Sequence, residues 1–297
     1  MNAIHYNNCP VCSSGNIQFV FSAKDNTVSQ QLFEIWQCND CTLRFTQDVP
    51  AENEIGRYYQ SENYISHTDT SKGLINRIYK AVRKKTLRKK RKLVCLVTGL
   101  TGGKVLDIGS GAGAFASEMM RNGWNVTALE PDEKARTVAR KNFGIELQPP
   151  DKLFALTAGS FDAITLWHVL EHVHLLHEYM QQMKNLLKKN GRVIIAVPNY
   201  TSKDADVYKQ FWAAYDVPRH LYHFSPKAMQ MLAGLYNLKI EAYKPMWFDS
   251  FYVSLLSSRY KSGKTSWLSA MWNGFRSNLK AVRDKKKCSS VIYVLAK

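Results

Sequence analysis

The chain has 297 residues, 45% of them hydrophobic, which is enough for one large domain with a proper core and a smaller module. It contains no apolar run long enough to cross a membrane, and its first residues do not resemble a secretory signal, so we expect a cytoplasmic protein. The formal charge of +17 favours either an anionic partner, such as RNA or a membrane surface, or simply a soluble basic protein.

Four of the six cysteines lie near the start of the chain, in two Cys-x-x-Cys pairs. Cys9 and Cys12 form the first pair, and Cys38 and Cys41 form the second. This spacing is typical of a zinc ribbon, in which each pair supplies two thiolates to one ion. We therefore expect a zinc-ribbon-like module over 1–45 with a structural zinc ion, since so short a segment needs metal to fold. Two disulfides and a redox-active pair are the alternative interpretations.

Residues 46–97 are expected to form a linker and then a basic helix. The linker is polar and contains several tyrosines, among them Tyr58, Tyr59 and Tyr64. The helix, expected at 72–97, carries nine basic residues between positions 80 and 92. We interpret these charges as a solvated helix face that links the two domains, and contact with RNA or an anionic lipid is the alternative.

The segment KVLDIGSGAG, from Lys104 to Gly113, predicts a buried strand, a glycine turn and the start of a helix. Such a turn places backbone N–H groups and a helix N-terminus beside a ligand. Glycine is needed there because a side chain would block close approach and because the turn visits positive φ. A second strand, 125–130, ends in Glu130, at the position where an acid can bind a ribose diol.

Two classes of ligand fit this geometry. Gly109, Gly111 and Ala114 satisfy the looser form of the dinucleotide fingerprint, G-x-G-x-x-A. However, Asp107 stands two residues before the first glycine, where it would repel a pyrophosphate and attract an amine. The sequence therefore favours S-adenosylmethionine, which has an ammonium and a sulfonium but no phosphate, over a nicotinamide or flavin dinucleotide.

The remainder of the chain alternates between strands and helices. Helices are expected at 114–123, 132–142, 174–189 and 226–236, and strands near Ile145 and at 161–167, 192–197, 238–244 and 291–295, with Gly191 ending the third helix. This alternation predicts an α/β fold whose sheet is mostly parallel, with helices on both faces. Two insertions are expected, an aromatic one at 199–224 and a helical one at 246–284. The second should pack on the core or on a partner chain, and a membrane-surface role is the alternative.

Four segments in this order resemble class I S-adenosylmethionine-dependent methyltransferases: VLDIGSGAG at 105–113, Glu130, FDAITLWHVLEHV at 161–173 and GRVIIAVPN at 191–199. The resemblance implies a seven-stranded Rossmann-like sheet over 98–297, with an antiparallel last strand. Ligands of such sheets bind at the carboxyl ends of the strands. The expected cofactor-binding residues are Asp107, Gly109, Ser110, Gly111, Gly113, Glu130, Pro131, Trp167, His168 and Glu171.

Polar residues concentrate between Tyr215 and Phe224. Methyl transfer needs alignment, a dry pocket and a nucleophile free of its proton. We expect His220 or His223 to remove that proton, with His168 as the reserve candidate, although histidines that only tie the insertion to the core are the alternative. The motif H-x-x-E-H at 168–172 is not interpreted as a zinc-protease site, because a strand runs directly into it. The expected substrate-binding residues are Tyr215, Asp216, Arg219 and Tyr222, with Arg219 holding an anionic group.

The leading hypothesis is a methyltransferase for a small-molecule acceptor, such as a sugar, a quinone-like compound or a lipid-linked metabolite. The second hypothesis is an RNA methyltransferase, because a zinc ribbon ahead of this fold resembles ribosomal RNA guanine methyltransferases. The end of the fifth strand, Val197-Pro198-Asn199-Tyr200, lacks the Asn-Pro-Pro-Tyr motif of enzymes that methylate base amino groups, which excludes only that subclass. The third hypothesis is a cofactor-binding scaffold without transfer activity.

Overall fold

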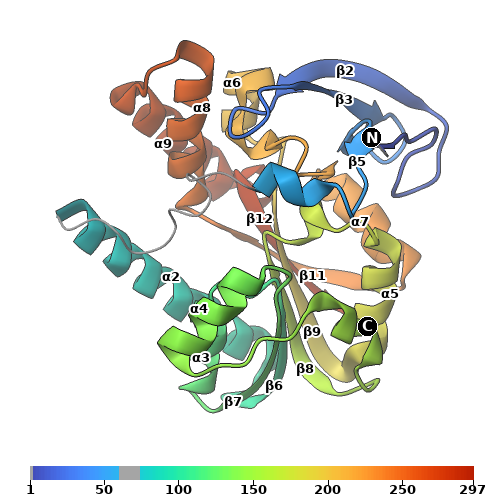
Figure 1. Cartoon of the computed structure of the whole chain (residues 1–297), viewed down its shortest axis with the longest axis vertical. Helices are drawn as coiled ribbons and strands as arrows, with labels where there is room; N and C mark the ends of the chain where they lie inside the picture. The colour runs from blue at the N-terminus through green and yellow to red at the C-terminus, as the bar shows by residue number, and fades with distance from the viewer. Residues whose placement is uncertain (1–2, 60–73) are drawn as a thin grey trace.

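The structure, a computed structural model, describes residues 3–59 and 74–297, with side chains from residue 83 onward in the second range. A central sheet separates two layers of helices, with α2 and α3 on one face and α5 and α7 on the other (Figure 1). The helices of these layers and the neighbouring α4 are α2 (Leu74–Thr98), α3 (Ala114–Met120), α4 (Glu133–Phe143), α5 (Leu176–Leu186) and α7 (Pro226–Leu235). The expected α/β fold is confirmed.

In the described part of the chain the central sheet has six strands rather than the predicted seven. Their order is β11 (Lys239–Pro245), β12 (Ser290–Ala296), β9 (Leu187–Pro198), β8 (Phe161–Trp167), β6 (Gly103–Ile108) and β7 (Trp124–Leu129). The strand expected near Ile145 is reduced to a single bridge between Leu129 and Gln148. The last strand, β12, is antiparallel to both of its neighbours, as expected, while β6 to β9 are parallel.

The prediction that Gly191 ends a helix is wrong. Helix α5 ends at Leu186, and β9 begins directly at Leu187 and runs through Gly191. The glycine allows β9 to lie close against β8, because a Cβ atom at this position would be 3.0 Å from the carbonyl oxygen of Phe161. The apolar stripe of α5 is therefore shorter than the sequence periodicity suggests.

The cysteine-rich module and the central domain share a sheet. Three strands of the module, β2 (Ile17–Lys24), β3 (Leu32–Cys38) and β4 (Arg44–Thr46), are continued by β10 (Tyr222–His223), which comes from the aromatic insertion. A further pair, β1 (Ala3–Ile4) and β5 (Val49–Pro50), extends the module to residue 50, so the predicted boundary at 45 falls inside β4. Figure 1 shows the module lying across the end of the central domain.

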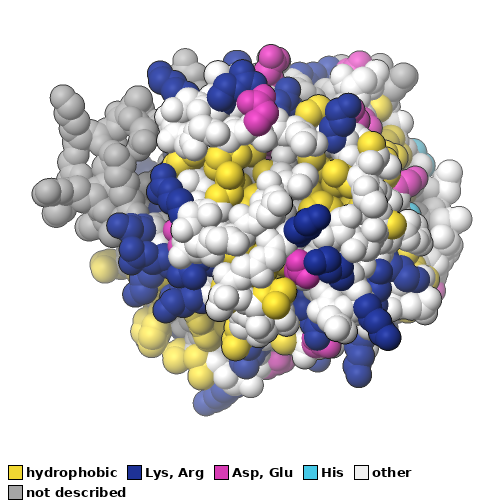
Figure 2. Space-filling model, turned by 90° about the horizontal axis from the view of Figure 1, so that it is seen from below, with side chains coloured by type: hydrophobic (Ala, Val, Ile, Leu, Met, Phe, Trp, Pro, Cys, Tyr) yellow, Lys and Arg dark blue, Asp and Glu magenta, His cyan; other side chains and the backbone are white. Residues whose placement is uncertain are grey.

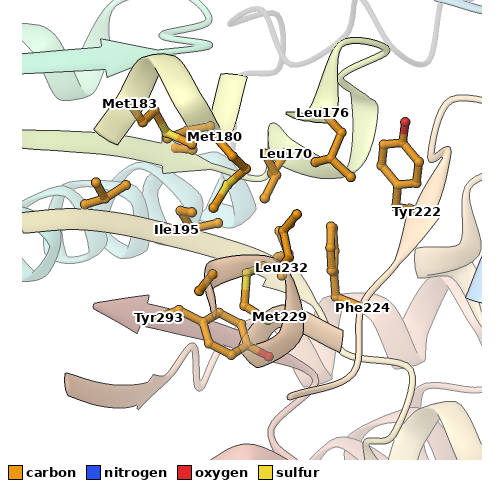
Figure 3. Packing of buried hydrophobic residues seen from close by; sticks show 14 of the residues in the cluster. Leu170, Leu176, Met180, Met183, Ile195, Tyr222, Phe224, Met229, Leu232 and Tyr293 are labelled. Atoms are coloured by element: carbon orange, nitrogen blue, oxygen red, sulfur yellow. The ribbon is translucent and has the colours of Figure 1, made fainter. Parts of the chain in front are cut away.

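One apolar cluster runs from the module into the central domain. It includes Cys38 and Phe45 of the module together with side chains of β9, α5 and α7. Figure 3 shows Met180 and Met183 of α5 and Met229 and Leu232 of α7 around Ile195 of β9, with Tyr222 and Phe224 at the side of the group. Burial of this continuous core joins the two parts into one packed unit.

Two insertions complete the fold. The first contains the short helix α6 (Lys203–Tyr208), and the second is a hairpin of α8 (Asp249–Ser262) and α9 (Trp267–Arg283). Helix α9 contacts both α8 and α6. Among the described residues, no helix is both long and apolar enough to cross a bilayer.

Candidate functional site

The glycine turn after β6 has the backbone that its sequence predicts. Gly109, Gly111 and Gly113 all have positive φ, between 53° and 76°. A Cβ atom on Gly109 would lie 2.3 Å from Val169, so this position accepts only glycine. A Cβ atom on Gly111, in contrast, would meet nothing within 4 Å. The middle of the turn therefore borders open space that a ligand can occupy.

Glu130 follows β7 and fixes this turn. One carboxylate oxygen accepts a hydrogen bond from the N–H of Gly111 at 2.7 Å, and the other accepts from the N–H of Asp132 at 3.0 Å. Burial raises the pKa of Glu130, and these two backbone hydrogen bonds act against that rise. The next residue, Pro131, presents its carbonyl oxygen to Arg136. The acid thus lies beside the glycine turn, as a ribose-binding residue must.

Asp107, at the end of β6, is 1% exposed. The hydroxyl of Ser110 donates to one of its oxygens at 2.6 Å, and that of Thr165 donates to the other at 2.7 Å. Burial raises the pKa of Asp107, while these hydrogen bonds and the charge of Lys90 lower it. Asp107 therefore holds the turn in shape and places negative charge beneath it, an arrangement that suits a cationic ligand.

Lys90 belongs to this site, although the sequence predicts that it lies on a solvated helix face. Its ammonium lies 4.4 Å from the ring centre of Trp167. Burial lowers its pKa, and Asp107 and Asp249 act in the opposite direction. The helical spacing indicates this position for Lys90, because Leu87, Lys90 and Val94 share one helix face and Val94 is fully buried.

The other basic residues of α2 are either exposed to solvent or packed against the central domain. Lys84, Lys85 and Arg88 are exposed, as a solvated face requires. Arg91 instead forms an ion pair with Glu118 of α3, 3.1 Å between Nε and Oε1. The side chain of Lys80 is not among those described, and Tyr64 of the linker lies outside the described residues altogether.

The site fits S-adenosylmethionine by the chemistry of its groups. Five buried polar atoms have no hydrogen-bond partner among the described residues, and two of them lie at or just after the end of β8: the indole N–H of Trp167 and one oxygen of Glu171. Buried polar atoms are normally satisfied, so such atoms mark a place where a ligand completes the bonding. Around the same turn, Glu130 is the acid that can bind a ribose, and the carboxylate of Asp107 can attract a cation.

Replacing Glu130 with alanine should weaken cofactor binding by about 1–3 kcal/mol, because the ribose contact is lost and Gly111 is no longer held. Isothermal titration calorimetry with S-adenosylmethionine measures this effect. Glu133→Ala is the matched control, since Glu133 is exposed in the first turn of α4. Equal affinities for the two variants would contradict the assignment.

His168 lies at the end of β8 between two carboxylates. Its Nδ1 is 3.3 Å from Glu171 and its Nε2 is 3.0 Å from Asp249, the first residue of α8. Burial lowers the pKa of His168, but the hydrogen bonds to both acids outweigh burial and raise it to about 10. The ring is therefore an imidazolium that donates from both nitrogens. It cannot accept a proton at neutral pH, so its reserve role as general base is not supported.

The ion pairs of His168 with Glu171 and Asp249 should make the stability of the fold depend on pH. A pKa raised from about 6.5 to about 10 stabilises the fold fully below pH 6.5, and this contribution is lost as pH rises through 10. Thermal unfolding midpoints should therefore fall more steeply between pH 7 and 10.5 for the parent protein than for His168→Gln. Parallel curves would show that His168 is not charged in the folded state.

Next to His168, three residues form a compact cluster: Glu171 and His172 of η3 (Leu170–His172), and His220 of the aromatic insertion. Their potential ligand or proton-binding atoms lie within 4.8 Å of one another, and the two histidine rings are 4.5 Å apart. His172 donates from Nδ1 to the carbonyl of Arg219, and burial together with His220 lowers its pKa to about 4. His220 donates from Nδ1 to the carbonyl of Ala214 at 2.9 Å. With the proton on Nδ1, the lone pair of the ring lies on Nε2 of His220.

The structure gives His223 a different place. Its Nε2 lies 3.1 Å from the hydroxyl of Thr46 in the module, and its ring packs edge-on against Tyr215. Burial, more than any neighbouring charge, lowers the pKa of His223 well below 6.5. Tyr215 in turn accepts a hydrogen bond from Arg44 of β4 at 2.7 Å. Tyr222 lies within the shared core. These contacts support packing between module and insertion, rather than the predicted catalytic and substrate-binding roles.

Arg219 was predicted to hold an anionic substrate, and this is not what its contacts allow. The side chain is 1% exposed and donates to Asp216, to Asp25 of the module and to the carbonyl of Tyr58. Because its N–H groups are directed to protein acceptors, no face remains for a substrate. Arg219 and Asp216 instead clamp the module onto the central domain.

Replacing Arg219 with alanine should lower the free energy of unfolding by about 3–5 kcal/mol, since buried Asp25 and partly buried Asp216 lose their cation. Denaturant unfolding followed by circular dichroism measures the change. Arg140→Ala is the control, because it removes an exposed pair with Glu146 and should leave the free energy of unfolding nearly unchanged. Similar losses for the two variants would contradict the clamp.

The four cysteines come together within the module, and three of them are buried. The sulfurs of Cys9 and Cys41 are 3.5 Å apart, and those of Cys12 and Cys38 are 3.6 Å apart. Disulfide sulfurs would be about 2.05 Å apart, whereas a tetrahedral zinc ion with bonds of about 2.3 Å separates its ligands by about 3.8 Å. The group thus fits zinc. Four protein ligands leave no open position, so the metal would be structural.

A hollow of about 790 Å³ lies between β2, α6 and the end of α9. Its lining is basic and includes Arg44, Lys203, Lys280 and Arg283. None of the cofactor-site residues described above lines it. The hollow is therefore separate from the glycine turn and from the cluster around His220.

The fold, the glycine turn and the acid after β7 define a class I S-adenosylmethionine-dependent methyltransferase. Comparison with known proteins agrees: the sequence profile of the methyltransferase-domain family matches residues 76–243. That is more than half of the chain, which therefore belongs to this family.

Two similar curated proteins are ubiquinone biosynthesis O-methyltransferases. The one from Cronobacter sakazakii is 36% identical over 112 residues, which cover 35% of this chain and 46% of the relative. The one from Xanthomonas oryzae pv. oryzae is 30% identical over 154 residues, covering 48% and 64%. The chain thus spans about half the length of the curated relatives it matches. A solved structure assigned as a sarcosine dimethylglycine methyltransferase from Galdieria sulphuraria has the same fold, with TM-score 0.50, 15% identity, and coverage of 72% of this chain and 87% of that one.

Proposed function

We propose that this chain transfers a methyl group from S-adenosylmethionine to a hydroxyl of a small, quinone-like acceptor, and that it does so in the cytoplasm. The observation that carries the proposal is the position of His220. One ring nitrogen of His220 lies within 4.8 Å of the buried carboxylate of Glu171, and its Nδ1 is bonded to the carbonyl of Ala214. The similarity to ubiquinone biosynthesis O-methyltransferases supports the acceptor class.

Contacts connect the proposed base to the cofactor turn. Val169 packs on Gly109, and Glu171 follows two residues later in η3. The backbone N–H of Leu221 donates to the carbonyl of Glu171 at 2.8 Å, so η3 holds the chain just after His220. An acceptor hydroxyl placed between the turn and His220 would therefore be near both partners of the reaction.

Each residue has a defined task in this proposal. Bound S-adenosylmethionine supplies an electrophilic methyl group on its sulfonium. Nε2 of His220 accepts the proton of the acceptor hydroxyl as its oxygen becomes nucleophilic. The carboxylate of Glu171 stabilises the imidazolium that forms, and Ala214 keeps the ring in the required tautomer. Tyr59, whose hydroxyl lies 3.0 Å from His172, and Trp167 contribute apolar surface that helps exclude water.

Methyl-labelled S-adenosylmethionine tests the function directly. Label should pass to a catechol-type quinol, and calorimetry should show binding of S-adenosylmethionine and none of NAD. Transfer of label to ribosomal RNA, with none to the quinol, would replace the acceptor class. Binding of NAD without binding of S-adenosylmethionine would overturn the cofactor assignment itself.

A further inference from the structure

The α8–α9 hairpin is packed through its small side chains. On α9 the buried positions are Ala270, Gly274, Ser277 and Ala281. On α8 the buried positions are Val253 and four serines, Ser250, Ser254, Ser257 and Ser258. Helices of water-soluble domains usually turn their large apolar residues inward. Here the inner faces of both helices are dominated by small residues.

The two helices approach each other closely as a result. A Cβ atom on Gly274 would lie 2.8 Å from the ring of Phe251, 3.0 Å from its Cα and 3.1 Å from the carbonyl of Ser250. Close backbone approach through small residues is the packing mode of helices in a lipid environment. It leaves no room between the helices for the large apolar side chains of α9.

Those large side chains point outward. Leu268, Trp272, Phe275, Leu279 and Val282 follow one another at intervals of four and three residues, which places them on a single face of α9. Leu268 is 89% exposed, and none of the others is less than 47% exposed. Trp267, at the start of the helix, is 65% exposed. A contiguous apolar face of this kind marks an interaction site.

Positive charge surrounds this face. Residues 249–287 contain nine lysines and arginines but only two acids, and one of the acids, Asp249, is paired with His168. Arg276, Lys280 and Arg283 are exposed on the flank of the apolar stripe, and Lys261 and Lys264 are exposed at the turn between the helices. Figure 2, which views the molecule from below Figure 1, shows that Lys and Arg side chains outnumber Asp and Glu side chains on that face as well.

We propose that the α8–α9 hairpin docks the protein on a membrane surface that contains anionic phospholipid. The apolar stripe of α9 enters the interface, Trp267 and Trp272 lie at headgroup level, and the flanking cations contact the lipid phosphates. Helices of 14 and 17 residues are shorter than the roughly 20 residues that a bilayer-spanning helix needs, so the hairpin lies in the interface.

A second copy of the chain is the competing occupant, since the spacing of the stripe also resembles a helix-pairing seam. Charge disfavours it. Two α9 helices placed face to face would bring Arg276, Lys280 and Arg283 of both copies together, and the described acids beside them, Asp206 and Asp284, are too few to neutralise them. An anionic surface, in contrast, complements every one of these charges.

Vesicle sedimentation tests the proposal with the full-length protein and does not depend on the methyl-transfer reaction. Binding is expected to vesicles of phosphatidylcholine with about one third phosphatidylglycerol, and to be much weaker with phosphatidylcholine alone. The variant Trp272→Asp/Leu279→Asp should bind at least about tenfold more weakly, because two inserted apolar groups are replaced by acids. Both positions are exposed, so the fold should persist, as circular dichroism will show.

Leu32→Asp is the matched control. Leu32 is 69% exposed on β3 of the module, and its substitution should leave vesicle binding unchanged. The proposal is overturned if the parent protein does not bind the anionic vesicles, or if the double variant binds as well as the parent. It is also overturned if sedimentation velocity shows a dimer that the double variant abolishes while vesicle binding persists.

Discussion

Loss of the zinc site is expected to destabilise the whole chain, not just its first 50 residues. Structural zinc contributes about 10–16 kcal/mol of binding free energy in small zinc modules. Cys41→Ser should remove the metal and lower the free energy of unfolding by several kcal/mol. The effect spreads because the apolar cluster that contains Cys9, Cys38 and Cys41 also contains the core of the central domain.

Two measurements on the same protein check this expectation. Metal analysis of protein purified without added zinc should give one ion per chain for the parent and none for Cys41→Ser, and the thermal midpoint should fall with the metal. Cys95→Ser is the control, because Cys95 lies on α2 outside the four-cysteine group. Disulfides found by mass spectrometry, together with an absence of zinc, would refute the site.

His220→Ala is expected to lower kcat by about 10²–10⁴-fold, the usual contribution of a general base. Affinity for S-adenosylmethionine should stay nearly constant, since the cofactor is held by the glycine turn and Glu130. The loss should shrink as pH rises, because the acceptor hydroxyl then ionises without help. Initial rates across pH, with and without added imidazole as a substitute base, measure these effects.

His223→Ala separates this role from packing. It removes a ring from the contact between the module and the insertion, so it should lower the thermal midpoint while kcat at permissive temperature stays close to the parent value. If His220→Ala instead keeps full activity at every pH, transfer relies on proximity alone and the base assignment is wrong.

The sequence predicted the cofactor turn well because its constraints are local. Positive φ at three glycines and an acid at the end of the next strand follow from spacing along the chain. The predicted strand at 161–167 also matches β8, since a short apolar run between turn residues admits few other structures. The strand near Ile145 was harder to judge, because an edge strand with a single bridge differs little from an extended loop.

The roles of other residues depend on contacts that no local pattern contains. Arg219 is paired with Asp25, 194 residues away, and His168 is paired with Asp249, 81 residues away. A cluster of histidines and an arginine near the site suggested catalysis and substrate binding. Only the fold shows that Arg219 and His223 pack against the module while His220 remains available. Lys90 could have been found, since it shares a face with buried Val94.

The strand β10, which completes the sheet of the module, has a consequence for synthesis of the chain. All four cysteines leave the ribosome early, so the zinc site can form while most of the protein is still unmade. Thr46 and its partner His223 are 177 residues apart, and at about 5–20 residues per second the second appears on the order of 10–40 s later. Throughout that interval β4 offers an unpaired edge, and an unpaired edge strand can add a strand from another chain. Nascent chains on neighbouring ribosomes are therefore the first competitors for the place that β10 finally takes.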